Sequence, residues 1–124
     1  MMLAAVLILS LSACYYDNEE ELYPQAAGGG GCDTANVTYS NVVSKIINTK
    51  CATSGCHAGA SGQAIGNFEN HANLKVFLDG KKATFVNAIN QTGGASPMPK
   101  GGAKLGSCDI LKIETWINKG YPNN

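Results

Sequence analysis

The chain has 124 residues, with nine basic and nine acidic side chains and no formal net charge, so it holds at most one small domain. All nine basic residues are lysines, and without arginine the chain lacks the bidentate phosphate contacts typical of nucleic-acid binding. Nine lysines and five acids leave residues 32–124 at +4, whereas four acids leave the preceding segment at −4. We expect no nucleic-acid partner, and a basic domain suits docking to an acidic protein.

The first 14 residues, MMLAAVLILSLSAC, form an apolar run that is too short to span a bilayer and ends in small residues and a cysteine. This layout is typical of a secretory signal, and LSAC at residues 11–14 resembles a bacterial lipobox. The resemblance implies a lipoprotein signal peptide over residues 1–13 and a lipid on Cys14, which would anchor an exported protein at the periplasmic or cell-surface face of an envelope membrane. An ordinary signal peptide or a buried apolar helix would explain the same run.

Residues 14–31 have no helical or strand periodicity, and their acidic run and four glycines predict a flexible tether. An acidic run behind a lipobox also resembles the surface-export tails of Bacteroidetes lipoproteins, although a plain solvated linker is the simpler interpretation. The folded domain is expected over residues 32–124.

Apolar residues in the domain recur with helical spacing, and no segment alternates convincingly as a strand does. A first helix is predicted within VTYSNVVSKIINTKC, with Thr38 or Ser40 as its cap and Cys51 at its far end. Residues 58–67 are small and glycine-rich and predict a loop. The segments NHANLKVFL and ATFVNAIN predict two further helices.

A loop rich in glycine and proline, QTGGASPMPKGGAKLG, separates these helices from a last one, CDILKIETWINKG. Ser107 is the predicted cap of that helix, and Gly120 ends it. The prediction is an all-α domain of about four short helices. Its apolar core is small for about ninety residues, and such domains usually need a disulfide, a metal or a cofactor.

Five cysteines can be sorted if the chain is exported to an oxidising compartment. Cys14 takes the lipid, and Cys51 and Cys56 belong to the motif CATSGCH. Cys32 and Cys108 remain, and a disulfide between them would stabilise the fold by ~4 kcal/mol in the chain-entropy account.

The motif CATSGCH places His57 directly after the second of its two cysteines, and four kinds of site come into question. A structural zinc needs four ligands, usually with a second cysteine pair. Beyond the three motif residues, only His71 is available, or Cys32 or Cys108 if these two are not paired. A Cys51–Cys56 disulfide leaves His57 unexplained, and a thiol nucleophile needs a base that an adjacent histidine seldom provides. Covalent haem explains all three residues, because two thiols can add to the haem vinyl groups while the histidine binds iron. The standard spacing of such an attachment motif is C-x-x-C-H. The spacing in this chain is C-x4-C-H, a longer form.

Met98 is the candidate for a second axial ligand, because methionine is common in that role and this one lies between Pro97 and Pro99 in a polar loop. A lone methionine is otherwise usually core filler. His71 is the rival ligand, and an open site is the third possibility.

The domain resembles class I c-type cytochromes, in particular small monohaem cytochrome lipoproteins of Bacteroidetes. The resemblance covers roughly residues 32–124 and rests on CDTANVTYSNVVSKIINTKCATSGCH, HANLKVFLDGKK and SPMPKGGAKLGSCDILKIETWINKGYPNN. It implies a cytochrome c-like bundle around one haem c, with Cys51 and Cys56 as thioether sites, His57 as proximal ligand and Met98 as distal ligand. It also implies that the first helix packs against the last.

The expected function is that of a membrane-tethered electron carrier, whose iron cycles between Fe(III) and Fe(II) without a small-molecule substrate and without enzymatic activity. Six apolar side chains are expected to enclose the haem: Ile46, Leu74, Phe77, Phe85, Ile89 and Trp116. Four lysines flank the Met98 loop in sequence and are expected to dock an acidic redox partner at the exposed haem edge, unless they are only solvated surface: Lys81, Lys82, Lys100 and Lys104. The alternatives are an electron-relay subunit of a larger respiratory or cell-surface complex and a haem-based gas sensor.

Overall fold

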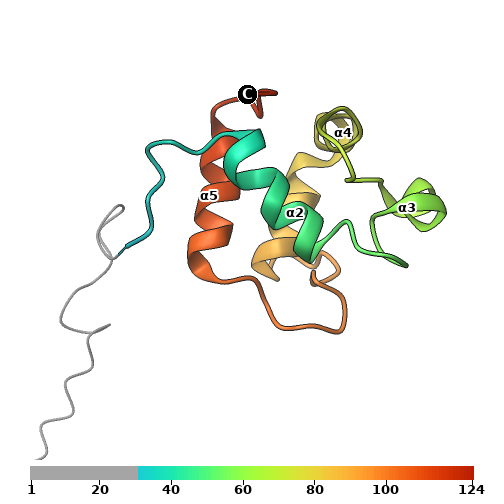
Figure 1. Ribbon diagram of the computed structural model, residues 1–124. Coiled ribbons are helices and arrows are strands. Elements are labelled where there is room, and N and C mark those ends of the chain that lie inside the picture. The colour runs from blue at the N-terminus through green and yellow to red at the C-terminus, as the bar shows by residue number, and fades with distance from the viewer. Residues whose placement is uncertain (1–30) are drawn as a thin grey trace, which may run out of the picture.

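The computed structural model describes residues 31–124, apart from the side chains at positions 61, 63 and 64. The predicted signal peptide, the lipidation site Cys14 and the tether up to residue 30 lie outside the described residues. The described chain is all-α, and no strand occurs in residues 31–124. Its elements are the π-helical turn η1 (Tyr39–Val43) and the helices α2 (Ser44–Lys50), α3 (Gly59–Ile65), α4 (His71–Asn90) and α5 (Ser107–Asn118) (Figure 1). Between residues 31 and 124, no helix has the length and apolar character needed to cross a membrane.

The turn η1 and helix α2 form one continuous helical segment whose start is capped twice. The Thr38 hydroxyl oxygen accepts a hydrogen bond from the Asn41 amide at 3.2 Å, as the sequence predicts for one of its two candidate caps. Asn124 accepts from the amide of Tyr39 through its side chain and from the amide of Ser40 through its backbone oxygen. The last residue of the chain therefore satisfies the first free N–H groups of this segment.

Helix α4 corresponds to the two helices predicted from NHANLKVFL and ATFVNAIN. They are joined across a kink at Lys81, whose φ of −139° and ψ of 30° are not helical. Leu74 and Leu78 are buried before the kink, and Phe85 and Ile89 are buried after it. The two halves of α4 therefore bury their apolar side chains in different places: Phe85 and Ile89 line the cavity described below, and Leu74 and Leu78 do not.

Helix α5 differs from the prediction at its start. The cap position is Gly106 rather than Ser107, because the backbone is still extended at Gly106 and enters the helix at Ser107, whose side chain makes no capping hydrogen bond. In its first turn Cys108 forms a disulfide with Cys32, with the two Cα atoms 5.5 Å apart. The disulfide joins the start of the domain to its last helix.

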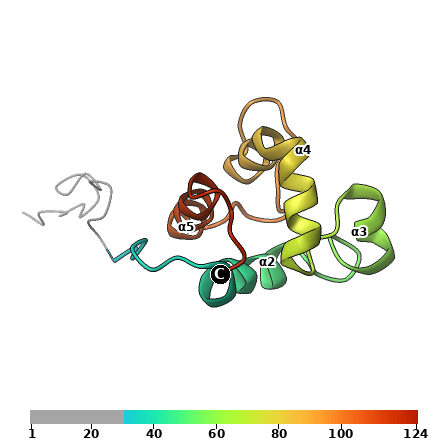
Figure 2. The same ribbon diagram turned by 90° about the horizontal axis from the view of Figure 1, so that it is seen from above.

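The apolar core lies between η1, α2, α4 and α5, which are grouped together in both views, whereas α3 lies at the far end from α5 (Figures 1 and 2). The rings of Tyr39 and Trp116 meet with centroids 5.6 Å apart, so the first helical segment packs against the last. The largest side chains that are fully buried come from all four of these elements: Trp116, Ile47, Leu74, Leu78, Ile113 and Val43.

The prediction of a loop over residues 58–67 was wrong, because Gly59–Ile65 form helix α3. Its sequence, GASGQAI, has no apolar stripe from which a helix could be inferred. Gly62 lies against the backbone of His57, where a Cβ atom would come within 2.9 Å of the His57 carbonyl carbon. Close packing against the CATSGCH segment therefore requires glycine at position 62 of this helix.

Candidate functional site

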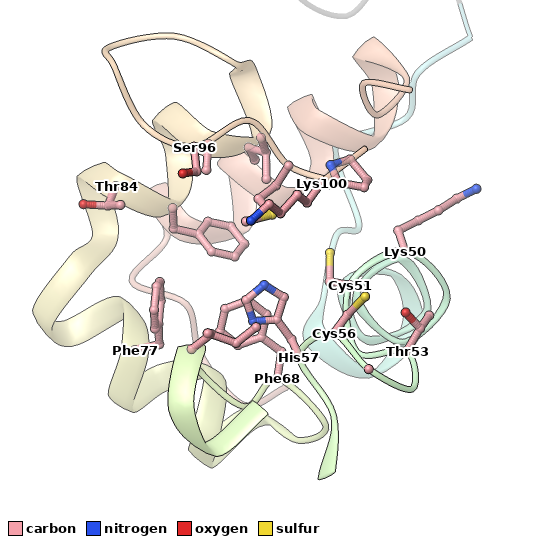
Figure 3. A pocket seen from close by; sticks show the side chains of 17 residues that line it. Lys50, Cys51, Thr53, Cys56, His57, Phe68, Phe77, Thr84, Ser96 and Lys100 are labelled. Atoms are coloured by element: carbon pink, nitrogen blue, oxygen red, sulfur yellow. The ribbon is translucent and has the colours of Figure 1, made fainter. Parts of the chain in front are cut away.

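A cavity of about 550 Å³ lies between four segments of the chain (Figure 3). These are the end of α2 with the CATSGCH loop, the segment from Ile65 to Phe68, residues 77–89 of α4, and the loop before α5. Its volume falls within the range of roughly 300–1,000 Å³ that small-molecule and cofactor sites occupy. Figure 3 shows Cys51, Cys56, His57 and Phe68 together on one side, with Ser96 and Lys100 across from them.

The CATSGCH loop closes on itself by backbone hydrogen bonds, and this brings both cysteines and the histidine to the cavity. The Cys51 amide continues α2 by donating to Ile47, while the Cys51 carbonyl accepts from the His57 amide at 3.1 Å. The Cys56 amide donates to the Thr53 carbonyl at 3.0 Å. The intervening residues 53–55 are exposed, so the longer C-x4-C spacing is taken up by a turn at the surface.

Both motif cysteines are free thiols, but their surroundings differ. Cys51 is half-buried and Cys56 is exposed. Burial, with a smaller contribution from the neighbouring Cys56, raises the pKa of Cys51 to about 11. Cys51 is therefore protonated at neutral pH, and the environment of this thiol does not favour a thiolate nucleophile.

His57 has one ring nitrogen committed to the protein. Its Nδ1 lies 2.7 Å from the Gly66 carbonyl oxygen, and because a carbonyl can only accept, Nδ1 donates the hydrogen. The neutral ring then carries a lone pair on Nε2, and Figure 3 shows the ring pointing into the cavity. Histidines that bind metals usually donate their other ring N–H to a carbonyl or carboxylate in this way.

Met98 lines the same cavity from the loop before α5. Its backbone amide donates to the Ala88 carbonyl at 3.0 Å, which holds this loop against α4. The structure thus brings together Cys51, Cys56, His57 and Met98, although Met98 is 41 positions after His57 in the sequence.

His71, the rival ligand, does not line the cavity. Its Nε2 donates to the Tyr121 carbonyl at 2.9 Å, and its ring packs edge-on against Tyr39 and Trp116. His71 therefore packs against the edge of the core beside the C-terminal segment. Among residues 31–124, no three His, Cys, Asp or Glu side chains are grouped as a metal site would require.

The wall of the cavity is aromatic. The three phenylalanines of the chain, Phe68, Phe77 and Phe85, all line it and meet edge to face, with centroids 5.0 Å apart for Phe68 and Phe77. Ile89 adds to this wall as predicted, but Leu74 and Trp116 are fully buried in the core instead. Ile46 packs at the core and is not a lining residue either. A helical stripe identifies the inward face of a helix, but it does not tell which layer each residue contacts.

Phe68 and Lys50 line the cavity and were not predicted to do so. Phe68 could have been noticed as the one large apolar residue among polar neighbours in GNFENH. Lys50 could have been noticed as the residue directly before Cys51.

The four lysines predicted to dock a partner are spread over the surface. Lys100 lines the cavity together with Lys50, and the Lys81 Nζ atom lies 5.7 Å from the centroid of the Phe77 ring. Lys104 lines a separate hollow beside the disulfide, and Lys82 is exposed and lines neither the cavity nor that hollow.

Comparison with known protein families, curated proteins and solved structures finds no match to this chain. The interpretation of the cavity therefore depends on its own residues and their geometry.

Proposed function

We propose that this chain is a monohaem c-type cytochrome that carries electrons while tethered to a membrane. One observation carries the proposal: the motif residues Cys51, Cys56 and His57 meet Met98, which is distant in the sequence, at one aromatic-walled cavity of about 550 Å³. The all-α fold is compatible with the cytochrome c-like bundle that the sequence resembles.

The residues present fit the group. Cys51 and Cys56 are free thiols at the cavity and would each hold a haem by a thioether. His57 has the tautomer that an iron ligand needs, since Nδ1 donates to Gly66 and Nε2 is left with the lone pair. Met98 would supply a thioether sulfur as the second axial ligand.

When bound, the group supplies one-electron exchange between ferric and ferrous iron. The chain's own contribution is a cavity wall of low polarity. Phe68 and Phe85 are almost fully buried in this wall, and the Phe77 ring packs edge-on against both. Such a wall keeps water from the site and, like a methionine ligand, favours the reduced state.

The deciding measurement is the absorption spectrum of the purified full chain, oxidised and reduced, before and after extraction of free haem with acidified solvent. We expect a c-type spectrum that survives extraction, with a weak far-red band in the oxidised form from methionine ligation. The Cys51→Ala/Cys56→Ala double variant should lose its haem on extraction. The matched control, Cys32→Ser/Cys108→Ser, removes two other cysteines and should keep it. A colourless wild-type protein would falsify the proposal.

Partner docking is proposed to involve the lysines at the cavity, Lys50 and Lys100, and Lys81, whose Nζ lies near the Phe77 ring of the cavity wall. Their charge would steer an acidic redox protein to the side where the cavity opens. An anionic iron–cyanide complex is a suitable probe: Lys100→Glu should slow its reaction at low salt and remove much of the salt dependence. Lys104→Glu, at the separate hollow, should change the rate much less. Equal effects of the two variants would contradict this assignment.

The proposed membrane tether is a lipid on Cys14. Cys14→Ala should release the protein into the soluble fraction of the cell envelope while leaving the spectrum unchanged. Continued membrane association of that variant would show that the anchor is elsewhere.

A further inference from the structure

His57 is held from three sides by a short segment that no motif marks, Gly66 to Phe68. The Gly66 carbonyl accepts from Nδ1 at 2.7 Å, and the Phe68 amide donates to the His57 carbonyl at 2.9 Å. The Phe68 ring lies flat on the imidazole, with centroids 4.1 Å apart and planes 6° apart. We call Gly66 and Phe68 the His57 clamp.

The two members of the clamp depend on each other. Gly66 has a φ of +111°, and a Cβ atom there would lie 2.7 Å from Cδ2 of Phe77 and 3.1 Å from Cε1 of Phe68. Only glycine therefore lets the carbonyl reach Nδ1 while the aromatic rings stay closed around it. Phe68 is 3% exposed and has Phe77 and Phe85 edge-on against it, so its ring has little freedom to tilt.

The hydrogen bond and the stacked ring restrain different motions of the imidazole. A single hydrogen bond at Nδ1 fixes roughly where that nitrogen points, but its tolerant geometry still allows small rotations of the ring about the Cβ–Cγ bond. A flat aromatic face at 4.1 Å opposes that rotation, because turning the imidazole would drive its edge into the Phe68 ring. Together the two contacts define both the direction and the plane of the imidazole.

We infer that Phe68 is a positioning residue that sets the plane of the His57 ring and keeps its Nε2 directed into the cavity. Its meaning for an iron ligand rests on the proposed function. The clamp itself is a property of the chain's own residues and is measurable with or without a bound group.

The test compares Phe68→Leu with Phe85→Leu in the full chain. Both changes remove one nearly buried ring from the same cavity wall, but only Phe68 stacks on His57. The primary readout is hydrogen exchange of the His57 Nδ1–H by NMR, in the reduced protein where haem is attached and otherwise in the protein as purified. We expect exchange about threefold to tenfold faster in Phe68→Leu, as the loss of one stacked pair implies, and little change in Phe85→Leu. Phe68→Tyr keeps the stacked face and should restore the wild-type rate.

The oxidised protein gives a second readout, because the plane of an axial imidazole determines how the paramagnetic shifts spread over the porphyrin methyl groups. Phe68→Leu should alter that pattern, and Phe85→Leu should leave it as in the wild type. Similar effects of both variants on exchange would overturn the inference and indicate general loosening of the wall. A wild-type protein without covalent haem would refute the proposed function alone, since the exchange measurement would still decide on the clamp.

Discussion

The two histidines of this chain have much in common locally and very different surroundings. Both are half-buried, both donate one ring N–H to a backbone carbonyl, and both contact aromatic rings. His57 lies at the cavity with two thiols and Met98, whereas His71 packs against the core residues Tyr39 and Trp116. A hydrogen bond to a carbonyl therefore does not by itself distinguish a ligand from a structural histidine; the space beside the second ring nitrogen does.

Replacing each histidine gives the sharpest contrast. His57→Ala should abolish the low-spin c-type spectrum, because it removes the proposed proximal ligand. His71→Ala should keep that spectrum but lower the free energy of unfolding by about 2 kcal/mol, because the Tyr121 carbonyl loses its donor. Absorption spectra and denaturant unfolding measure the two effects. Loss of the methionine band in His71→Ala but not in His57→Ala would reverse the assignment.

The disulfide tests whether the core region can be weakened without disturbing the cavity. The Cys32→Ser/Cys108→Ser variant should lose ~4 kcal/mol of unfolding free energy, because the bond spans 76 residues. Its absorption spectrum should remain that of the wild type, since neither cysteine lines the cavity. A normal stability of this variant in denaturant titration would contradict the expected role of the bond.

Gly66 tests whether tight packing at the cavity contributes to the stability of the domain. Gly66→Ala should cost about 2 kcal/mol in unfolding free energy, because its Cβ atom would collide with Phe77 and the φ of +111° is unfavourable for alanine. Gly80→Ala is the control: its Cβ atom would meet nothing within 4 Å, and alanine favours the helix. If the two variants unfold at the same denaturant concentration, the packing around Gly66 is looser than described.

The smallest expected effect concerns pH at the C-terminal segment. Asp79 accepts hydrogen bonds from Lys75 Nζ and the Tyr121 hydroxyl, and both bonds lower the pKa of the Asp79 carboxyl. The unfolded chain then binds more protons in acid, so this contribution to stability is present above about pH 4 and is lost as the pH falls further. The Asp79→Asn variant should melt below the wild type at neutral pH, and the difference between the two melting temperatures should become smaller as the pH falls into the acidic range. A difference that stays constant with pH would contradict the assignment.

The sequence predicted the helices that have an apolar stripe and missed the one that has none. The first helical segment, both halves of α4 and α5 were predicted from spacing alone, because each buries one face. Helix α3 was not predicted, since its sequence has no apolar stripe, and the close approach of Gly62 to the His57 backbone exists only in the folded chain. The cap of α5 was also predicted one residue too late, at Ser107 instead of Gly106, because the cap position depends on where the backbone turns helical.

The candidate site shows the same division. Its candidate residues could be identified by type, as thiols, imidazole and thioether, and the structure brings all four to one cavity. Its walls were less predictable: Trp116 was expected at the haem and lies in the core, and Phe68 was overlooked and stacks on His57. Sequence spacing indicates which face of a helix is buried, whereas neighbours in space are determined by how the helices pack.

The disulfide between Cys32 and Cys108 has one further consequence, for the integrity of the molecule after damage. Every residue of the cavity, from Lys50 to Lys100, lies within the closed covalent ring that this bond makes of the chain. A protease that cuts once in the exposed turn at residues 91–94 would open the ring without releasing a fragment. The nicked protein would run as one band on a gel without reductant, and the parts that carry His57 and Met98 would remain physically linked.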